Sequence, residues 1–237
     1  MNKKIIIYVL SAVVVIALLF GTYKLMNART HQAFGTIISE VETDQKVVAL
    51  TFDDGPSRNV GSIISLLRTY NVKATFFLIG NEMEQYPEET RAIVEAGHQV
   101  GNHTFSHDRM VFKTPSFIKK EIEKTNKLIK EAGYEEEIDF RPPNGKKLFI
   151  LPYYLNKQGI DTITWNLEPD SFFTNANDKI NYVEENIHEG SIILMHPLYD
   201  QSGTALEAIE GIIQSLLSKG YTFVTVEEMK QLHGERS

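Results

Sequence analysis

The sequence has 237 residues and no cysteine, which excludes disulfide bonds, thiolate metal sites and cysteine nucleophiles. The first 30 residues hold four of the 24 Lys and Arg residues and none of the 31 Asp and Glu residues, so the rest of the chain carries a net charge of −11. A domain this acidic is a poor candidate for binding nucleic acid or an anionic membrane through its overall charge.

The chain opens on an apolar segment. No charged residue lies between Lys4 and Lys24, and this run of about 19 residues is close to the roughly 20 that cross a bilayer as a helix. A signal peptide is the alternative, because its apolar region is usually about 7–15 residues long and precedes a cleavage site with two small residues. Neither residues 26–28 nor residues 31–33 begin with a small residue, which favours an anchor that is not cleaved.

We therefore predict a transmembrane anchor over residues 1–25, a linker over residues 26–45 and a folded domain over residues 46–237. Lys3 and Lys4 favour a cytoplasmic N-terminus. The domain is then expected outside the cytoplasm, held at the cell membrane, or secreted if the N-terminal segment is cleaved.

From residue 46 onward, short apolar runs alternate with amphipathic stretches, and we expect each run to form a strand and each stretch a helix. Seven such units in one domain call for a parallel sheet, because parallel strands need crossover helices. Periodicity alone leaves a barrel and a doubly wound open sheet both possible. The expected strands are residues 47–52, 74–79, 99–102, 138–141, 162–166, 192–195 and 221–225.

Polar clusters follow five of these strands directly. They read TFDDGPS, NHTFSH, FRPPNG, TWNLEPDSF and LMHP, after the first, third, fourth, fifth and sixth strands. The carboxyl ends of parallel strands are where α/β folds place their active sites. The five clusters therefore predict one active site at this rim.

A metal site is expected from the first two clusters. His103 and His107 are four residues apart, so that on one helical turn both imidazoles face the same way. Adding Asp54 gives a set of two histidines and one carboxylate that leaves a position open for water, which suits zinc hydrolysis, although non-haem iron uses the same ligand types. Thr104 stands where zinc proteases with an H-E-x-x-H motif carry Glu, which argues against that class.

Two further residues have a possible catalytic part. A surface salt bridge is one interpretation of Arg141, but next to an acidic metal rim its guanidinium is better explained as orienting Asp53. His196, at the end of the sixth strand, could serve as a general acid.

The five segments, in this order and at these intervals, resemble the polysaccharide deacetylases with a NodB homology domain (carbohydrate esterase family 4), over about residues 46–230. The resemblance implies an α/β fold that is a distorted, incomplete (β/α)7 barrel, here preceded by the transmembrane helix. It also implies a metal-dependent hydrolase that removes N-acetyl groups from N-acetylglucosamine residues of peptidoglycan or chito-oligosaccharides and releases acetate. Some members instead remove O-acetyl groups from xylan.

The resemblance also implies a role for each matching residue. Asp53 is the expected general base, positioned by Arg141, and His196 is the expected general acid. The expected metal ligands are Asp54, His103 and His107, holding Zn²⁺, Co²⁺ or another divalent ion. The expected substrate and oxyanion residues are Pro143, Asn144, Trp165 and Leu194.

Two positions depart from the family pattern. Asn144 stands where the family usually has Tyr, so a ring wall for the sugar is lost. Ser171 and Phe172 stand where the family usually has Asp and Trp, which leaves Asp170, one position earlier, as the candidate that tunes His196.

The expected partners are a glycan substrate and, through the N-terminal helix, the membrane, with no nucleic acid and with the chain as a monomer. Two alternatives remain open. The chain could be a non-catalytic glycan-binding envelope protein that keeps the metal site, or an O-acetyl esterase of the xylan type.

Overall fold

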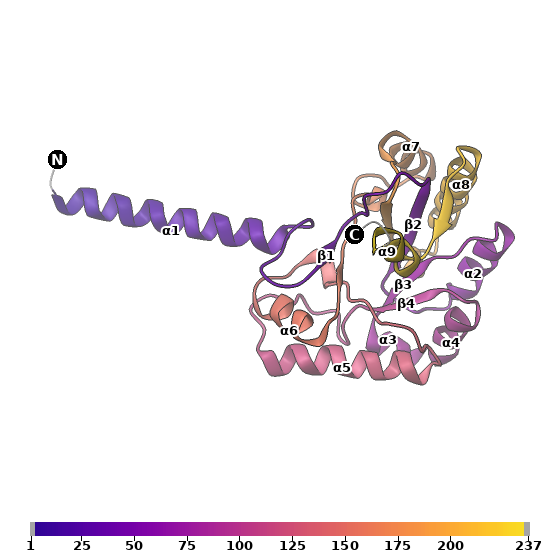
Figure 1. Cartoon of the computed structure of the whole chain (residues 1–237), viewed down its shortest axis with the longest axis horizontal. Helices are drawn as coiled ribbons and strands as arrows, with labels where there is room; N and C mark the ends of the chain where they lie inside the picture. Colours follow the sequence, from indigo (N-terminus) through magenta and orange to yellow (C-terminus); the bar gives the residue numbers. More distant parts are fainter. Residues whose placement is uncertain (1–2, 235–237) are drawn as a thin grey trace.

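The computed structural model describes residues 3–234, which form one α/β domain with a long N-terminal helix projecting from it (Figure 1). The strands are β1 (Ile37–Ile38), β2 (Val47–Asp53), β3 (Thr75–Leu78), β4 (Gln99–Asn102), β5 (Thr162–Ile163), β6 (Ser191–Met195) and β7 (Thr222–Val224). The α-helices are α1 (Lys3–Asn27), α2 (Val60–Thr69), α3 (Gly80–Gln85), α4 (Pro87–Glu95), α5 (Pro115–Glu131), α6 (Ile150–Gln158), α7 (Ala176–Asn186), α8 (Thr204–Ser218) and α9 (Val226–Gly234). Three short 3₁₀ helices are η1 (Pro143–Gly145), η2 (Pro169–Ser171) and η3 (Pro197–Tyr199).

The named strands pair in parallel, which confirms the expected α/β architecture. The main sheet has the order β4-β3-β2-β6, with β7 paired to the first residues of β2 and β3 to its last residues. β1 and β5 form a separate pair. Single bridges join the two sheets, from Asn102 to Phe140, from Phe140 to Thr162 and from Leu167 to Ile193. The ring of strands therefore closes through isolated bridges, which makes the barrel distorted.

Two strands differ from the expectation. Residues 138–141 form no regular strand and keep only the bridges of Phe140. Pro142 and Pro143 follow at once and have no backbone N–H to continue a ladder. β1 was not expected, because two residues are too short to show an alternation in the sequence.

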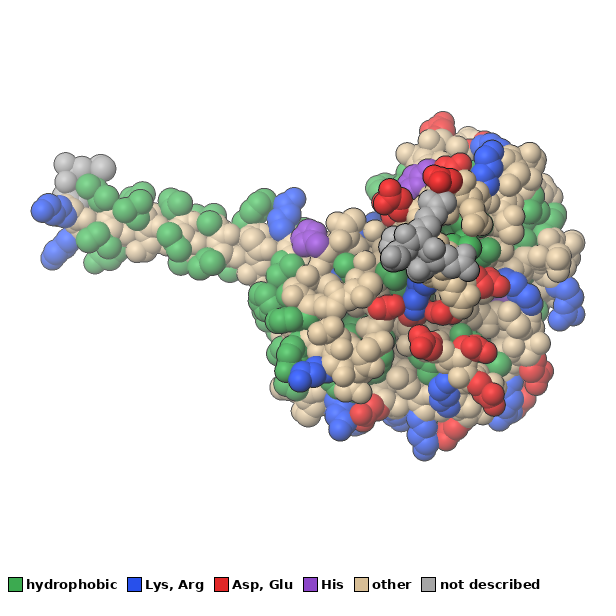
Figure 2. Space-filling view, in the orientation of Figure 1, with side chains coloured by type: hydrophobic (Ala, Val, Ile, Leu, Met, Phe, Trp, Pro, Cys, Tyr) green, Lys and Arg blue, Asp and Glu red, His purple; other side chains and the backbone are tan. Residues whose placement is uncertain are grey.

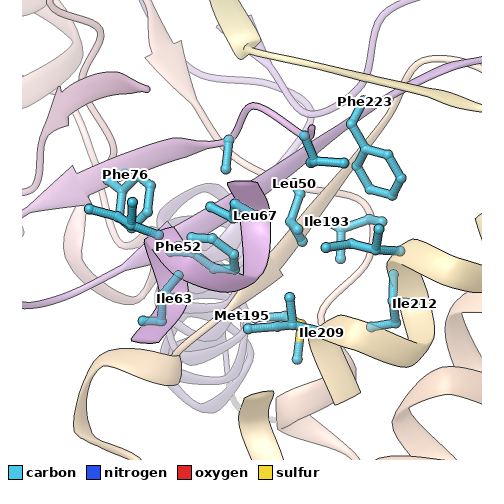
Figure 3. Packing of buried hydrophobic residues seen from close by; sticks show 14 of the residues in the cluster. Leu50, Phe52, Ile63, Leu67, Phe76, Ile193, Met195, Ile209, Ile212 and Phe223 are labelled. Carbon is cyan, nitrogen blue, oxygen red and sulfur yellow. The ribbon is translucent and has the colours of Figure 1, made fainter. Parts of the chain in front are cut away.

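β2 is the central strand, and its seven residues are buried. Successive side chains of a strand point to opposite faces. One face carries Leu50 and Phe52 into the layer between the sheet and helices α2 and α8 (Figure 3). The other face carries Ala49, Thr51 and Asp53 toward the interior of the ring, so Asp53 belongs to an inward-facing row although its carboxylate is polar.

The N-terminal helix α1 is long and apolar enough to cross a membrane, and none of its residues is buried against the domain. It ends at Asn27, and the segment expected as a linker, residues 26–45, then packs on the domain. β1 pairs with β5, and Val41 is buried. The folded unit therefore begins several residues before position 46.

Lys230 of α9 holds the amino ends of the strands together. Its Nζ lies 2.8 Å from Asp139, 3.1 Å from Asp161 and 3.0 Å from Glu227. Burial raises the pKa of Asp139 to about 6 even against this cation. The cation of Lys230 therefore offsets the unfavourable burial of the Asp139 carboxylate.

We predict that Lys230→Ala lowers the free energy of unfolding by about 3–5 kcal/mol, because Asp139 is then left as a buried charge without its cation. The matched control is Lys127→Ala, which removes an exposed pair with Glu131 and should cost less than about 0.5 kcal/mol. Urea unfolding of the full chain in detergent measures both. Equal losses for the two variants would contradict this role of Lys230.

Candidate active site

The site begins at the carboxyl end of β2, where the inward-facing Asp53 meets Arg141. Arg141 is fully buried, and its Nη1 donates to Asp53 Oδ1 at 2.7 Å and to Thr51 Oγ1 at 2.8 Å. Its Nη2 donates to the carbonyl oxygen of Thr164 at 2.9 Å. Burial by itself raises the pKa of Asp53, but the positive charge beside it, above all the guanidinium of Arg141, outweighs burial, so that this pKa falls below its ordinary value. Asp53 is therefore an oriented carboxylate that stays ionised.

Asp54, His103 and His107 converge beside this pair. Asp54 Oδ1 lies 3.3 Å from His107 Nε2 and 3.7 Å from His103 Nε2, and the three potential ligand atoms all lie within 4.8 Å of one another. Asp54 Oδ1 is also buried and has no hydrogen-bond partner among the described residues. A divalent metal ion fits this set, because it would satisfy that oxygen.

The protonation of His103 also suits a ligand. Its Nδ1 lies 2.8 Å from the carbonyl oxygen of Arg141, so Nδ1 carries the proton and Nε2 is left free to accept. Burial lowers the pKa of His103 by more than the nearby Asp53 and Asp54 raise it. The imidazole is therefore held neutral, as metal binding requires.

The two histidines lie on a loop, whereas the sequence suggested one helical turn. Residues 103–107 contain no helix, and Thr104 and His107 have φ of 69° and 59°. Thr104 Oγ1 accepts from the backbone N–H of His107 at 3.0 Å. Asn102 Oδ1 in turn accepts from the N–H of Thr104 at 2.8 Å. The rings still meet, with centroids 5.0 Å apart, because side-chain oxygens hold the loop.

Glu121 of α5 is a supporting residue that the sequence analysis missed. Its Oε2 accepts from the backbone N–H groups of Phe105 and Ser106 at 3.0 and 2.8 Å, and from Ser106 Oγ at 2.9 Å. A signal was present, since Glu121 is an acid at a position flanked by the buried Ile118 and Ile122. A carboxylate that is buried in this way usually accepts several hydrogen bonds, which compensate its charge.

Backbone strain is concentrated at the same place. Non-glycine residues rarely adopt positive φ, and the cost is of order 1–3 kcal/mol each. Four of the six described non-glycine residues with positive φ belong to the site motifs. They are Asp54, Thr104, His107 and Asn144. Asparagine tolerates this conformation better than most residues, which suits it to position 144.

His196 follows β6 and lies against Asp170 of η2. Asp170 Oδ2 accepts from the backbone N–H of His196 at 2.7 Å and lies 3.4 Å from its Nδ1, while Oδ1 pairs with Lys179 at 2.6 Å. Burial alone lowers the pKa of His196, but Asp170 and the two carboxylates at the end of β2 raise it to about 9. The imidazole is therefore protonated at neutral pH and can donate a proton.

One cavity of about 330 Å³ is lined by the two carboxylates and the three histidines described above: Asp53, Asp54, His103, His107 and His196. Asn144 and Trp165 also line it, whereas Pro143 and Leu194 are buried and do not. A larger cavity of about 460 Å³ lies near Tyr134 and contains none of the residues expected in the site, so size does not identify the chemistry.

Arg29, from the expected linker, completes one wall of the cavity and was not anticipated. Its guanidinium stacks 4.5 Å from the ring of Trp165 and binds Glu168 Oε2 at 2.9 Å. Glu168 Oε2 also accepts from Trp165 Nε1 at 2.9 Å. Nothing in the local sequence around Arg29 indicates this contact, because it joins residues 139 positions apart.

Residues 40–163 match the family model described as polysaccharide deacetylase. The chain belongs to the polysaccharide deacetylase family. The family predicted from the sequence motifs is thereby confirmed.

Among curated relatives of this member of the polysaccharide deacetylase family, a peptidoglycan-N-acetylglucosamine deacetylase of Bacillus cereus is 36% identical over 80% of the chain and 70% of the relative. Other relatives are longer, and the chain spans 31% and 41% of two of them. The solved structure of the Bc1960 peptidoglycan N-acetylglucosamine deacetylase has a TM-score of 0.76 and 31% identity, covering 81% of this chain and 91% of that one. The structure of BA3943, a CE4 family pseudoenzyme from Bacillus anthracis, has a TM-score of 0.74 and 28% identity, covering 83% and 69%.

We predict that His107→Ala weakens Zn²⁺ binding by more than the roughly 10–100-fold that loss of an outer hydrogen-bond partner costs a metal site. His188→Ala is the matched control, since that imidazole pairs with Glu40 and precedes β6, at the opposite end of the strand from His196. Calorimetric titration of chelator-treated full chain with Zn²⁺ compares the two variants. Unchanged affinity in His107→Ala would remove this residue from the ligand set.

Proposed function

We propose that the chain is a monomeric, Zn²⁺-dependent N-deacetylase. Its substrate is the N-acetylglucosamine of peptidoglycan, and α1 anchors it with the domain outside the cytoplasm. The observation that carries the proposal is the convergence of an ionised carboxylate, Asp53, and a protonated imidazole, His196, on the cavity that Asp54 and the two loop histidines line.

Asp54, His103 and His107 would hold a divalent ion, which would supply Lewis-acid polarisation of the acetyl carbonyl and of the attacking water. The protein's first task is to accept the proton of that water. Asp53 is suited to it, because Arg141 fixes the orientation of its carboxylate and leaves Oδ2 facing His103 Nε2 at 3.7 Å, toward the cluster.

The second task is to release the amine. When the C–N bond of the tetrahedral intermediate breaks, the departing nitrogen needs a proton, and His196 holds one at neutral pH. Asp170 orients this imidazole from the side of Nδ1. Acetate and a glucosamine residue are the products.

The substrate class is inferred from the relatives and from the net charge of the domain. The relative from Bacillus cereus and the Bc1960 structure are named as peptidoglycan N-acetylglucosamine deacetylases. The chain after residue 30 carries a net charge of −11. This charge is compatible with a neutral sugar that becomes cationic on deacetylation.

A non-catalytic glycan-binding protein is the second candidate, and the similarity to a CE4 pseudoenzyme favours it. The departure from the family pattern at Ser171 and Phe172 favours it as well. Asp170 argues for catalysis, because it contacts His196 at 3.4 Å and gives the acid a carboxylate partner. An O-acetyl esterase would use the same groups and would differ in hydrolysing an ester faster than the amide.

We expect the Zn²⁺-loaded full chain to release acetate from peptidoglycan and from chito-oligosaccharides. Asp53→Asn should lower kcat by about 10²–10⁴-fold, because the amide cannot accept the proton. Asp178→Asn, an exposed position on α7, is the matched control and should retain activity. An enzymatic acetate assay measures each. No acetate from either glycan, with Zn²⁺ shown to be bound, would favour the glycan-binding alternative, and faster release from acetylated xylan would favour the esterase.

The pH profile tests the pairing of His196 with Asp170. Because the acid must carry a proton, activity should fall as the pH rises through the pKa of His196, which is about 9. Asp170→Asn removes a carboxylate that raises this pKa, so the alkaline limb of kcat should move to lower pH. Asp178→Asn should leave the limb in place. An unmoved limb in Asp170→Asn would show that Asp170 does not tune the acid.

A further inference from the structure

α6 carries apolar side chains on two faces. Leu151 and Leu155 are buried in the core formed with α5. On the outer side, Ile150 and Tyr153 are 40% and 49% exposed, and Phe149, just before the helix, is 51% exposed. The last turn of α6 is polar and exposed. Its outer face therefore exposes a local group of apolar side chains, and such a group marks a contact surface.

Phe34 extends this surface from the segment that follows α1. It is 43% exposed, and its ring meets that of Tyr153 edge-on with centroids 5.5 Å apart. We refer to Phe34, Phe149, Ile150 and Tyr153 together as the α6 patch. Figure 2 shows hydrophobic side chains gathered on the side of the domain from which α1 projects. Charged side chains are spread over the rest of the visible face of the domain.

The joint between α1 and the domain is built from direct contacts. The backbone N–H of Lys147 donates to the carbonyl oxygen of Met26 at 3.3 Å. The Nζ atoms of Lys146 and Lys147 bind Asn27 Oδ1 and the carbonyl oxygen of Ala28. These contacts hold the end of α1 against the turn that precedes α6, so α6 keeps a fixed place near the end of α1 (Figure 1).

The charge of this region is the reverse of that of the domain. Residues 141–160 contain four Lys and Arg residues and no Asp or Glu, and no acid precedes Glu40. Lys157 lies 5.6 Å from the centre of the Tyr153 ring. Arg141 and Lys147 are buried, so Lys157 is the exposed cation of this segment. Glu123 of α5 lies 3.5 Å from Tyr154, on the side of α6 that faces α5. Exposed aromatic rings beside a lysine are what a helix at a lipid interface presents, because the rings enter the headgroup layer and the cation meets the phosphates.

We propose that the α6 patch rests in the outer interfacial layer of the bilayer that α1 spans. The inference rests on the proposed anchoring by α1 and is independent of the proposed deacetylation. A surface of exposed apolar side chains marks a protein or membrane contact, and here the bilayer is the occupant that the adjacent apolar helix already brings to the patch. The cavity, whose wall includes Arg29 two residues after α1, is thereby held close to the membrane surface.

The experiment uses the absence of cysteine, which makes single-cysteine labelling of the full chain clean. Ile150→Cys and Leu217→Cys form a matched pair, since both lie on helices and are 40% and 39% exposed. Tyr153→Cys gives a second position in the patch. Each variant receives an environment-sensitive fluorophore and is reconstituted into vesicles of phosphatidylcholine and phosphatidylglycerol whose acyl chains carry a doxyl quencher.

We expect labels at positions 150 and 153 to emit at shorter wavelength than the label at 217 and to lose most of their emission to the quencher, because an interfacial helix face lies about 5–10 Å into the headgroup boundary. Emission of the only tryptophan, Trp165, shows that each variant is folded. Equal quenching at 150, 153 and 217 in chains that float with the vesicles would overturn the docking while leaving the anchor intact. Disulfide crosslinking of two chains through position 153 without quenching would assign the patch to a second copy and would also overturn it.

Discussion

The buried ion pair between Arg141 and Asp53 is the constraint on which the site depends. Arg141 is fully buried, and the Asp53 side chain is 3% exposed, so neither charge has water to replace its partner. Removing one member of such a pair typically costs about 3–5 kcal/mol. The same arginine fixes His103 through its carbonyl oxygen and holds the Thr164 strand end through its guanidinium. The proposed base, a proposed metal ligand and the cavity wall with Trp165 are thereby placed by one residue.

This constraint explains why the carboxylate can be both buried and ionised. Asp53 occupies an inward position of β2, which in a purely structural barrel would be apolar. The cation compensates its charge inside the ring, while Asp54, one residue later, turns to the rim with φ of 74°. Two adjacent carboxylates thus meet different surroundings, and different surroundings are what allow one to act as a base and the other as a ligand.

Much of this arrangement could be predicted from local sequence. The order of βα units and the positions of Asp53, Asp54, His103 and His196 at strand ends follow from periodicity and from the parallel topology. The geometry of the loop at residues 103–107 could not be predicted in the same way. It depends on hydrogen bonds between residues 15 to 24 positions apart, from Ser106 to Glu121 and from Asn102 to Asn126. Arg29 was beyond reach for a stronger reason. Its partners lie more than 130 residues away, and its neighbours in the chain read as a linker.

The contacts at the end of α1 set the distance between the cavity and the membrane in the proposed anchored state. A catalytic domain on a flexible tether explores a shell whose depth grows with tether length. Here Lys146 and Lys147 bind the residues that leave the helix, and Arg29 is already part of the cavity wall. If α1 anchors the chain as proposed, the domain therefore has almost no search radius along the membrane normal. It would meet those glycan strands that come to the bilayer surface, and lateral diffusion in the plane would replace reach into the wall.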